Sequence, residues 1–324
     1  MFSEEELGNL LEELLQKEDL SELQKRNVER TYEEYVKNRK YTSEFVRRLS
    51  AQVNKTFHAW VESRKRNSFS FYKNDLDILI ELKKQETDIL GYENHPYNAL
   101  LDEFEKGATV ALLDQTFDLL LPTLKDLLDV ILKQPQIDDS FLKQHYPKQQ
   151  QWEWGMHLIK NLNFDFEAGR QDISEHPFSV SFNKNDVRIT TRIDETDLGN
   201  MTWSCIHETG HALYEQGLPE GEYGLPLGEA CSYSIHESQS RLWENNVGRS
   251  KTFWQNVYPV LKGFFSQQLN NTSVEQFFKG INKVQPSLIR TESDELTYHF
   301  HVYIRYELEK RLIEGSLTSV DIPG

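Results

Sequence analysis

The chain has 324 residues, and its 52 acidic and 36 basic side chains give a formal net charge of -16 at pH 7. This acidic balance argues against a nucleic-acid partner and against docking on an anionic membrane surface, because both require clustered Lys and Arg. The only two cysteines are Cys205 and Cys231, so the chain is not a disulfide scaffold, and a buried structural thiol is expected at each.

The N-terminal sequence predicts a cytoplasmic protein. It begins MFSEEELGNLLEELL, which is acidic from residue 4 and lacks the apolar core of a signal peptide. No apolar run in the chain approaches the ~20 residues that a membrane span requires. Because the chain has no repeat, low-complexity tract or Ser/Gly linker, we expect a single domain over residues 1–324. A helical region (1–175) would precede a region (176–324) that contains the sheet.

Successive helices are predicted over residues 1–165. Two segments show helical spacing of apolar residues, namely Leu20, Leu23, Val28 and Tyr32, and then Phe45, Leu49, Val53, Phe57 and Trp60. Residues 108–133 are strongly apolar on one face. Pro122 lies inside that run and predicts a kink or a break.

The strand signal lies at residues 178–192. Residues 179–182 and 186–192 have extended character and are joined by a turn-prone Asn-Lys-Asn sequence. In the second segment Val187 and Ile189 alternate with polar residues, so the strand period of two places the apolar pair on one face. We therefore expect a small antiparallel sheet in a mainly α-helical fold. Its polar face would either line a cleft or form an ordinary solvated edge.

Helix signals return after the sheet. Thr196 or Asp197 can cap a helix that runs to about residue 216, and Gly217 follows as its C-terminal stop. Further helices are predicted over 227–246 and 290–314.

His207-Glu208-Thr209-Gly210-His211 is an H-E-x-x-H sequence on the capped helix. Positions i and i+4 share one helix face, so the imidazoles of His207 and His211 can reach one metal ion. Glu208 would lie beside that ion and could act as a general base toward water. The alternative is a pair of hydrogen-bonded core histidines. Gly210 costs about 1 kcal/mol relative to Ala inside a helix, which predicts that another segment packs closely against this turn.

A catalytic zinc has three protein ligands, so a third must come from elsewhere in the chain. Glu237 lies 26 residues after His211 on the next predicted helix, and the loop at 217–227 is long enough for that helix to turn back. Glu229 is a rival, and so is His236, although His236 points to a different helix face from Glu237. Such ligands accept Zn²⁺, Co²⁺ or Mn²⁺, and we expect zinc.

Five motifs occur in order along the second half of the chain. In chain order they are His-Pro-Phe (176–178), DVRIT (186–190), HETGHALYEQGL (207–218), SIHESQSRLWEN (234–245) and IRTESDEL (289–296). Together they resemble the carboxypeptidase Taq (M32) family of metallocarboxypeptidases, with Ser293 in place of the Ala that is usual in its IRxxADE motif. A weaker resemblance extends through most of the chain.

The resemblance implies a zincin-like metallopeptidase, mainly α, with a small antiparallel sheet beside the HExxH helix. By position, it makes His207, His211 and Glu237 the ligands of one divalent metal ion and Glu208 the general base. It implies a carboxypeptidase that hydrolyses the C-terminal bond of peptides with a free C-terminus. Family members often form homodimers, so a second copy is also an implied partner.

The resemblance also implies substrate-binding residues. Arg290, with Arg188 as second choice, would bind the terminal carboxylate of the substrate, since a guanidinium meets a carboxylate through two parallel hydrogen bonds. Each arginine could instead belong to a structural ion pair. His176 and Asp186 lie in motifs that shape the family's substrate site, and each could instead be a hydrogen-bonding brace.

Relative to the family, the chain is expected to be shortened at both ends. It has no counterpart of the family's N-terminal WD-containing segment, its C-terminal GxxQDxHW motif or a Tyr expected to contact substrate. Two other interpretations therefore stay open. One is a non-catalytic, metal-binding remnant of the fold, and the other is a related dipeptidyl carboxypeptidase or oligopeptidase.

Overall fold

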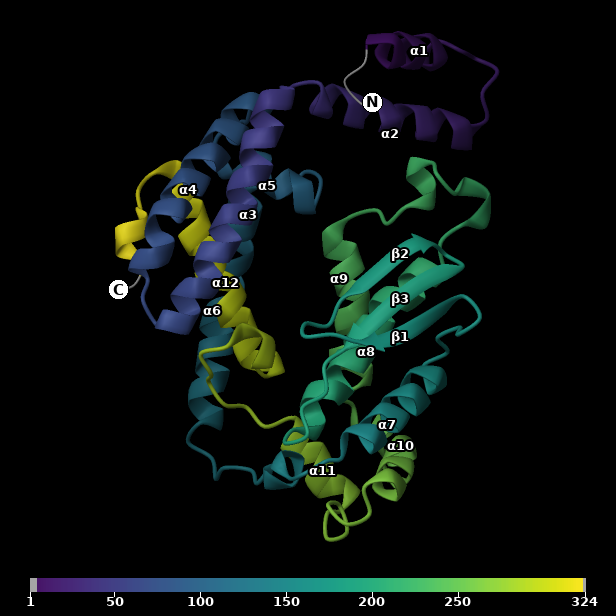
Figure 1. Ribbon diagram of the computed structural model, residues 1–324, viewed down its shortest axis with the longest axis vertical. Coiled ribbons are helices and arrows are strands. Elements are labelled where there is room, and N and C mark those ends of the chain that lie inside the picture. The colour runs from purple at the N-terminus through teal and green to yellow at the C-terminus, as the bar shows by residue number, and fades with distance from the viewer. Residues whose placement is uncertain (1–4, 323–324) are drawn as a thin grey trace. The chain divides into compact units, whose positions relative to one another are not determined.

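A computed structural model of the chain describes residues 5–322 (Figure 1). The helices are α1 (Glu5–Leu15), α2 (Glu22–Asn38), α3 (Ser43–Arg66), α4 (Ser70–Leu90), α5 (Tyr97–Phe104), α6 (Val110–Ile131), α7 (Lys148–Asn161), α8 (Leu198–Gln216), α9 (Tyr233–Arg241), α10 (Lys251–Phe264), α11 (Val274–Ile281) and α12 (Glu295–Glu314). The strands are β1 (Gly169–Ile173), β2 (Ser179–Asn183) and β3 (Asp186–Thr191). The fold is mainly helical, as predicted.

The described residues form two compact units, residues 5–120 with 302–322 and residues 121–301. The first unit is built from helices, among which α3 and α4 pack against each other along their lengths. Its small core contains the buried side chains of Tyr97, Val110, Tyr306 and Ile313. The second unit holds the sheet, the H-E-x-x-H sequence and every residue predicted for the site.

The sheet of the second unit has the strand order β1-β3-β2. The predicted antiparallel pair is confirmed, because β2 and β3 run antiparallel with Ser179 opposite Ile189. The prediction missed β1, which pairs with β3 in parallel, so the sheet is mixed rather than purely antiparallel. The sequence of β1, GRQDI, lacks an apolar alternation, and its pairing depends on a neighbour that is distant in sequence. Gly169 permits the pairing because a Cβ atom there would collide with the carbonyl of Val187.

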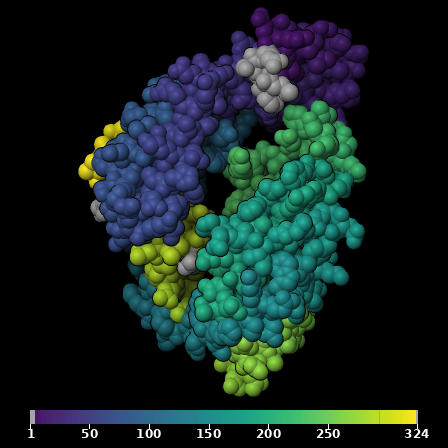
Figure 2. All heavy atoms as spheres, viewed as in Figure 1, coloured from purple at the N-terminus to yellow at the C-terminus, as the bar shows by residue number. Residues whose placement is uncertain are grey.

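Helix α8 is the central element of the second unit. It packs against β2, β3, α7 and α9, and in the space-filling view the atoms of the sheet form a closed surface in front of it (Figure 2). The inner face of the sheet meets α8 through the fully buried Val187 and Ile189, whereas Arg188 between them is exposed. The predicted cap is confirmed at Asp197, whose side chain accepts a hydrogen bond from the Gly199 N–H at 2.8 Å, and the helix ends before Gly217.

Helix α6 continues through Pro122, so of the kink or break predicted there, the break is absent. Two predicted helix starts need correction. The helix predicted to begin at residue 227 begins at Tyr233, because Ser232 caps it by accepting from the Ile235 N–H; a π-helical turn then continues over Leu242–Val247. The last helix begins at Glu295 rather than 290, because the Asp294 carboxylate accepts from the N–H groups of Leu296 and Thr297.

The two cysteines have different environments. Cys205 is buried as predicted, and burial raises the pKa of its thiol to about 11. The prediction was wrong for Cys231, which is exposed because it lies in the loop before α9. Within residues 5–322, no helix is both long enough and apolar enough to cross a membrane.

Candidate metal centre

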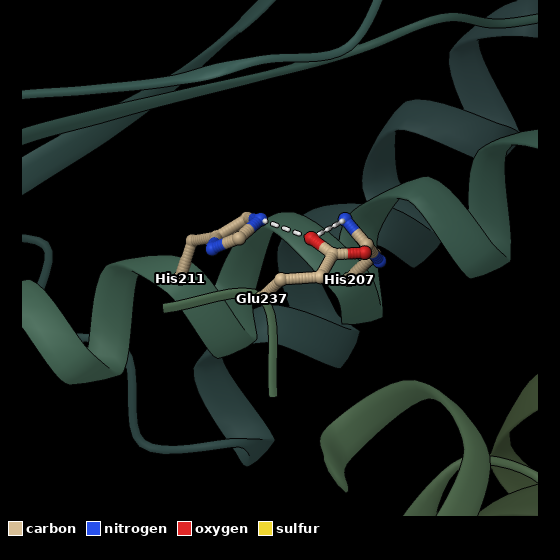
Figure 3. A group of neighbouring side chains, drawn as sticks. All are labelled: His207, His211 and Glu237. Carbon is tan, nitrogen blue, oxygen red and sulfur yellow. Dashed lines mark ion pairs between the residues drawn. The ribbon is translucent and has the colours of Figure 1, made fainter. Parts of the chain in front are cut away.

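The side chains of His207 and His211 on α8 and of Glu237 on α9 converge at the interface of the two helices. Glu237 Oε2 lies 3.6 Å from His207 Nε2 and 3.3 Å from His211 Nε2 (Figure 3). The donor atoms of all three residues lie within 4.8 Å of one another. In a tetrahedral site with ligand bonds of about 2.0–2.2 Å, neighbouring donor atoms are about 3.4 Å apart. The arrangement therefore fits a four-coordinate divalent metal ion, with one position left for water or substrate.

Gly210 permits the close approach of α8 and α9 that brings Glu237 to the two histidines. A Cβ atom at this position would lie 2.5 Å from Ser240 Cα and 2.9 Å from the Gln239 carbonyl oxygen. Both are backbone atoms of α9, so a rotamer change cannot relieve the collision. The prediction that another segment packs against this helical turn is confirmed.

Gly210→Ala is therefore expected to lower the free energy of unfolding of the metal-free protein by about 1–3 kcal/mol, the usual cost of overpacking, despite the better helix propensity of Ala. It should also weaken metal binding, because α9 must move away from the histidines. Urea unfolding and chelator competition measure the two effects. Gly263→Ala is the matched control, since a Cβ atom on this glycine of α10 meets nothing within 4 Å. Equal stability of the two variants would contradict the prediction.

A carboxylate orients the first imidazole. Glu244 Oε2 lies 2.8 Å from His207 Nδ1, so it accepts the Nδ1–H and leaves the Nε2 lone pair facing Glu237 and His211. Burial acts to lower the pKa of His207, but the hydrogen bond and the charge of Glu244 outweigh it, so the pKa is raised. Glu244 lies in the π-helical turn, and Arg241 also donates to its Oε2 at 3.0 Å.

The second imidazole contacts another histidine. His211 Nδ1 lies 2.6 Å from His236 Nδ1, and His236 Nε2 lies 2.7 Å from Glu215 Oε1. His236 was a candidate for the third ligand, but it contacts the ring nitrogen of His211 that faces away from Glu237. The other rival, Glu229, is exposed and lies outside the group.

Glu237 is held ionised. Burial acts to raise its pKa, but the nearby His211, His207 and Arg241 lower it to about 2. Arg241 donates from Nε to Oε1 of this carboxylate at 3.0 Å. The second oxygen, Oε2, is the atom directed at the two imidazoles, so the residue presents one fixed anionic oxygen to a metal ion.

Glu208 is buried beside the histidine pair, with 6% of its surface exposed. Its Oε2 accepts a hydrogen bond of 2.5 Å from the hydroxyl of Ser179 on β2. Within the part of the chain that the structure describes, its Oε1 has no hydrogen-bond partner. The sheet thus fixes the carboxylate through one oxygen and leaves the other available to a water molecule.

Two of the predicted substrate residues pair with each other. Arg188 donates from Nε and Nη2 to the two carboxylate oxygens of Asp186, each at 2.8 Å, and its guanidinium lies 5.0 Å from the Phe182 ring centroid. The structural ion pair considered for Arg188 is therefore present, on the exposed face of the sheet. His176 is exposed in the loop between β1 and β2.

Arg290 is linked to Glu237 through two side chains, Tyr298 and Arg241. It donates from Nη1 to the hydroxyl of Tyr298 at 2.7 Å. The face of the Tyr298 ring lies 4.0 Å from the guanidinium of Arg241, which in turn binds Glu237. Arg290 is half-buried and forms no ion pair with a residue that the structure describes.

Several residues that surround the site were not predicted, among them Glu244 and Arg241, which contact His207 and Glu237, Ser179, which contacts Glu208, and Glu215, which contacts His236. Glu215 and Glu244 carried a usable signal, because Glu215 continues the i, i+4 spacing of His207 and His211 and Glu244 lies seven residues after Glu237. Ser179 alternates with apolar residues along its strand, but nothing in the sequence pairs it with Glu208. The remaining residue, Arg241, follows Glu237 by one helical turn.

Comparisons with known proteins agree with this geometry. The family model "Carboxypeptidase Taq (M32) metallopeptidase" matches residues 1–324. Carboxypeptidase 1 of Bacillus subtilis is 39% identical over 312 residues, which are 95% of this chain and 62% of that protein. Thermostable carboxypeptidase 1 of Pyrococcus furiosus is 36% identical over 322 residues, which are 98% of this chain and 64% of that protein.

A solved structure shows the same fold. The M32 carboxypeptidase of Deinococcus radiodurans superposes with a TM-score of 0.94 at 36% identity, covering 99% of this chain and 64% of that one. The chain thus spans less than two thirds of the length of these relatives, as the predicted shortening requires. With the match over its whole length, it belongs to the carboxypeptidase Taq (M32) family of metallopeptidases and is homologous to the family's metallocarboxypeptidases.

Proposed function

We propose that this chain is a metal-dependent carboxypeptidase that removes the C-terminal residue from peptides with a free C-terminus. The observation that supports it most is the convergence of His207, His211 and Glu237, with the buried Glu208 carboxylate beside them, in a chain of this family. The three convergent residues would hold one divalent ion, with zinc favoured over cobalt and manganese. When bound, such an ion supplies Lewis-acid activation of a carbonyl group and of water.

Glu208 is proposed as the general base. Its Oε1 would accept a proton from the attacking water and then deliver it to the leaving amine, while Ser179 holds Oε2 in place. Because the carboxylate is buried, few competing waters surround it. General acid–base catalysis of this kind raises a reaction rate by about 10²–10⁴-fold.

Arg290 is proposed to bind the terminal carboxylate of the substrate. Its Nη1 is held by Tyr298, which leaves other N–H donors of the guanidinium for a carboxylate. Arg188 suits this role less well, because Asp186 already occupies two of its donors. His176 and Asp186 are proposed only to shape the substrate site, Asp186 by fixing Arg188.

The test is to purify the chain, measure its metal content and assay one peptide as the free acid and as the C-terminal amide. We expect about one equivalent of metal, release of single residues from the free acid and little reaction with the amide. Release of dipeptides would favour a dipeptidyl carboxypeptidase, and cleavage of the amide an oligopeptidase. A bound metal with no cleavage of either peptide would favour a non-catalytic remnant.

A further inference from the structure

The Nδ1 atoms of His207 and His211 have different partners. A carboxylate, that of Glu244, contacts Nδ1 of His207 directly, whereas the imidazole of His236 stands between Nδ1 of His211 and the carboxylate of Glu215. Two hydrogen bonds form a series here: Glu215 Oε1 lies 2.7 Å from His236 Nε2, and His236 Nδ1 lies 2.6 Å from His211 Nδ1. Glu215 and His211 come from α8 and His236 from α9, so the series crosses the interface that also positions Glu237.

The hydrogens of this series can be assigned by counting donors and acceptors. An ionised carboxylate only accepts, so the hydrogen between Glu215 and His236 belongs to His236 Nε2. The other nitrogen of a neutral His236 then only accepts, so the hydrogen between the two rings belongs to His211 Nδ1. This leaves a lone pair on His211 Nε2, the atom that lies 3.3 Å from Glu237 Oε2.

The surroundings are compatible with this assignment. The hydroxyl of Ser240 lies 3.1 Å from His211 Nε2 and 3.0 Å from the Glu237 carbonyl oxygen, so its single hydrogen can point to either acceptor. The ring of Tyr214 contacts His236 edge to face, with ring centroids 5.2 Å apart, so His236 is oriented by packing as well as by Glu215. Both Glu215 and His236 are mostly shielded from solvent, with 15% and 20% of their side chains exposed.

We propose that Glu215 acts through His236 to hold His211 in the Nδ1–H tautomer, which directs the Nε2 lone pair at the metal ion. Glu215 and His236 are thus positioning residues rather than ligands. This inference rests on the proposed metal site. Loss of an outer hydrogen-bond partner of a metal-bound histidine costs about 10–100-fold in metal affinity, which sets the size of the expected effect.

The test compares His236→Phe with His236→Asn. Phe keeps a planar ring but has no acceptor, whereas the Asn side-chain oxygen lies close to the position of the imidazole Nδ1 and can accept from His211. Zinc affinity is measured by chelator competition, and the His211 tautomer by ¹⁵N–¹H correlation spectra of the metal-free protein. We expect His236→Phe to lose about 10–100-fold in zinc affinity and to depart from the Nδ1–H tautomer, while His236→Asn retains both properties.

Two further variants make the result decisive. Glu215→Leu keeps His236 but removes the carboxylate, and it should also weaken zinc binding and shift the His211 tautomer, even if His236→Phe does not fold. His157→Phe is the control, because this half-buried imidazole on α7 bonds Asn161 instead of a metal ligand. An unchanged His211 tautomer in both His236→Phe and Glu215→Leu would overturn the inference, whatever their zinc affinity. Absence of zinc binding by the unsubstituted chain would instead overturn the proposed metal site.

Discussion

Glu208→Gln is expected to lower kcat on a free-acid peptide by about 10²–10⁴-fold, the contribution of a general base, with metal content unchanged. Gln has nearly the same shape as Glu but cannot take a proton from water. The hydroxyl of Ser179, which donates to Glu208 Oε2 at 2.5 Å, can donate equally to the amide oxygen of Gln. The substitution should therefore preserve the position of the side chain and remove only its basicity.

Glu229→Gln is the matched control for this variant, because Glu229 is an exposed glutamate that does not belong to the group of His207, His211 and Glu237. It should keep the activity of the unsubstituted chain. If Glu208→Gln were as active as Glu229→Gln at equal metal occupancy, another group would have to serve as the base. Loss of metal from Glu208→Gln would point to a structural role for the carboxylate.

The parts of the fold that depend on nearby residues were predictable. The span of α8 followed from its Asp197 cap and the Gly217 stop, and the hairpin of β2 and β3 followed from alternation about a turn. His207, His211 and Glu208 followed from helical periodicity, because their relation is fixed within a single turn of α8. Gly210 even predicted a close contact, since a glycine inside a helix requires a reason that lies outside it.

The parts that depend on contacts between distant segments were not predictable in the same way. Strand β1 pairs in parallel with a strand that is not its neighbour in sequence, and its residues carry no apolar pattern. The partners Glu215 and His236 meet only because α9 crosses α8 at Gly210, and Glu244 reaches His207 from a π-helical turn. From the residues alone, Glu229, His236 and Glu237 were all candidates for the third ligand; the geometry groups Glu237 with the histidines.

Glu237→Ala is expected to weaken zinc binding by well over the 10–100-fold that loss of an outer partner costs, because it removes one of three proposed ligands. It also removes the one carboxylate among the three proposed ligands. The pKa of this carboxylate is lowered to about 2, so it is ionised at neutral pH. Two imidazoles alone would present no negative charge to the cation. Chelator competition at neutral pH measures the loss.

The comparison with Glu229→Ala makes this experiment specific to the ligand set. Both variants delete one glutamate and change the net charge by the same amount, so a general effect of the acidic chain on cation binding should be equal in the two. Arg241 keeps a carboxylate partner in Glu237→Ala, because it also binds Glu244 at 3.0 Å, which limits the damage to α9. Metal loss in Glu229→Ala with retention in Glu237→Ala would assign the third ligand to Glu229, and only the opposite pattern supports Glu237.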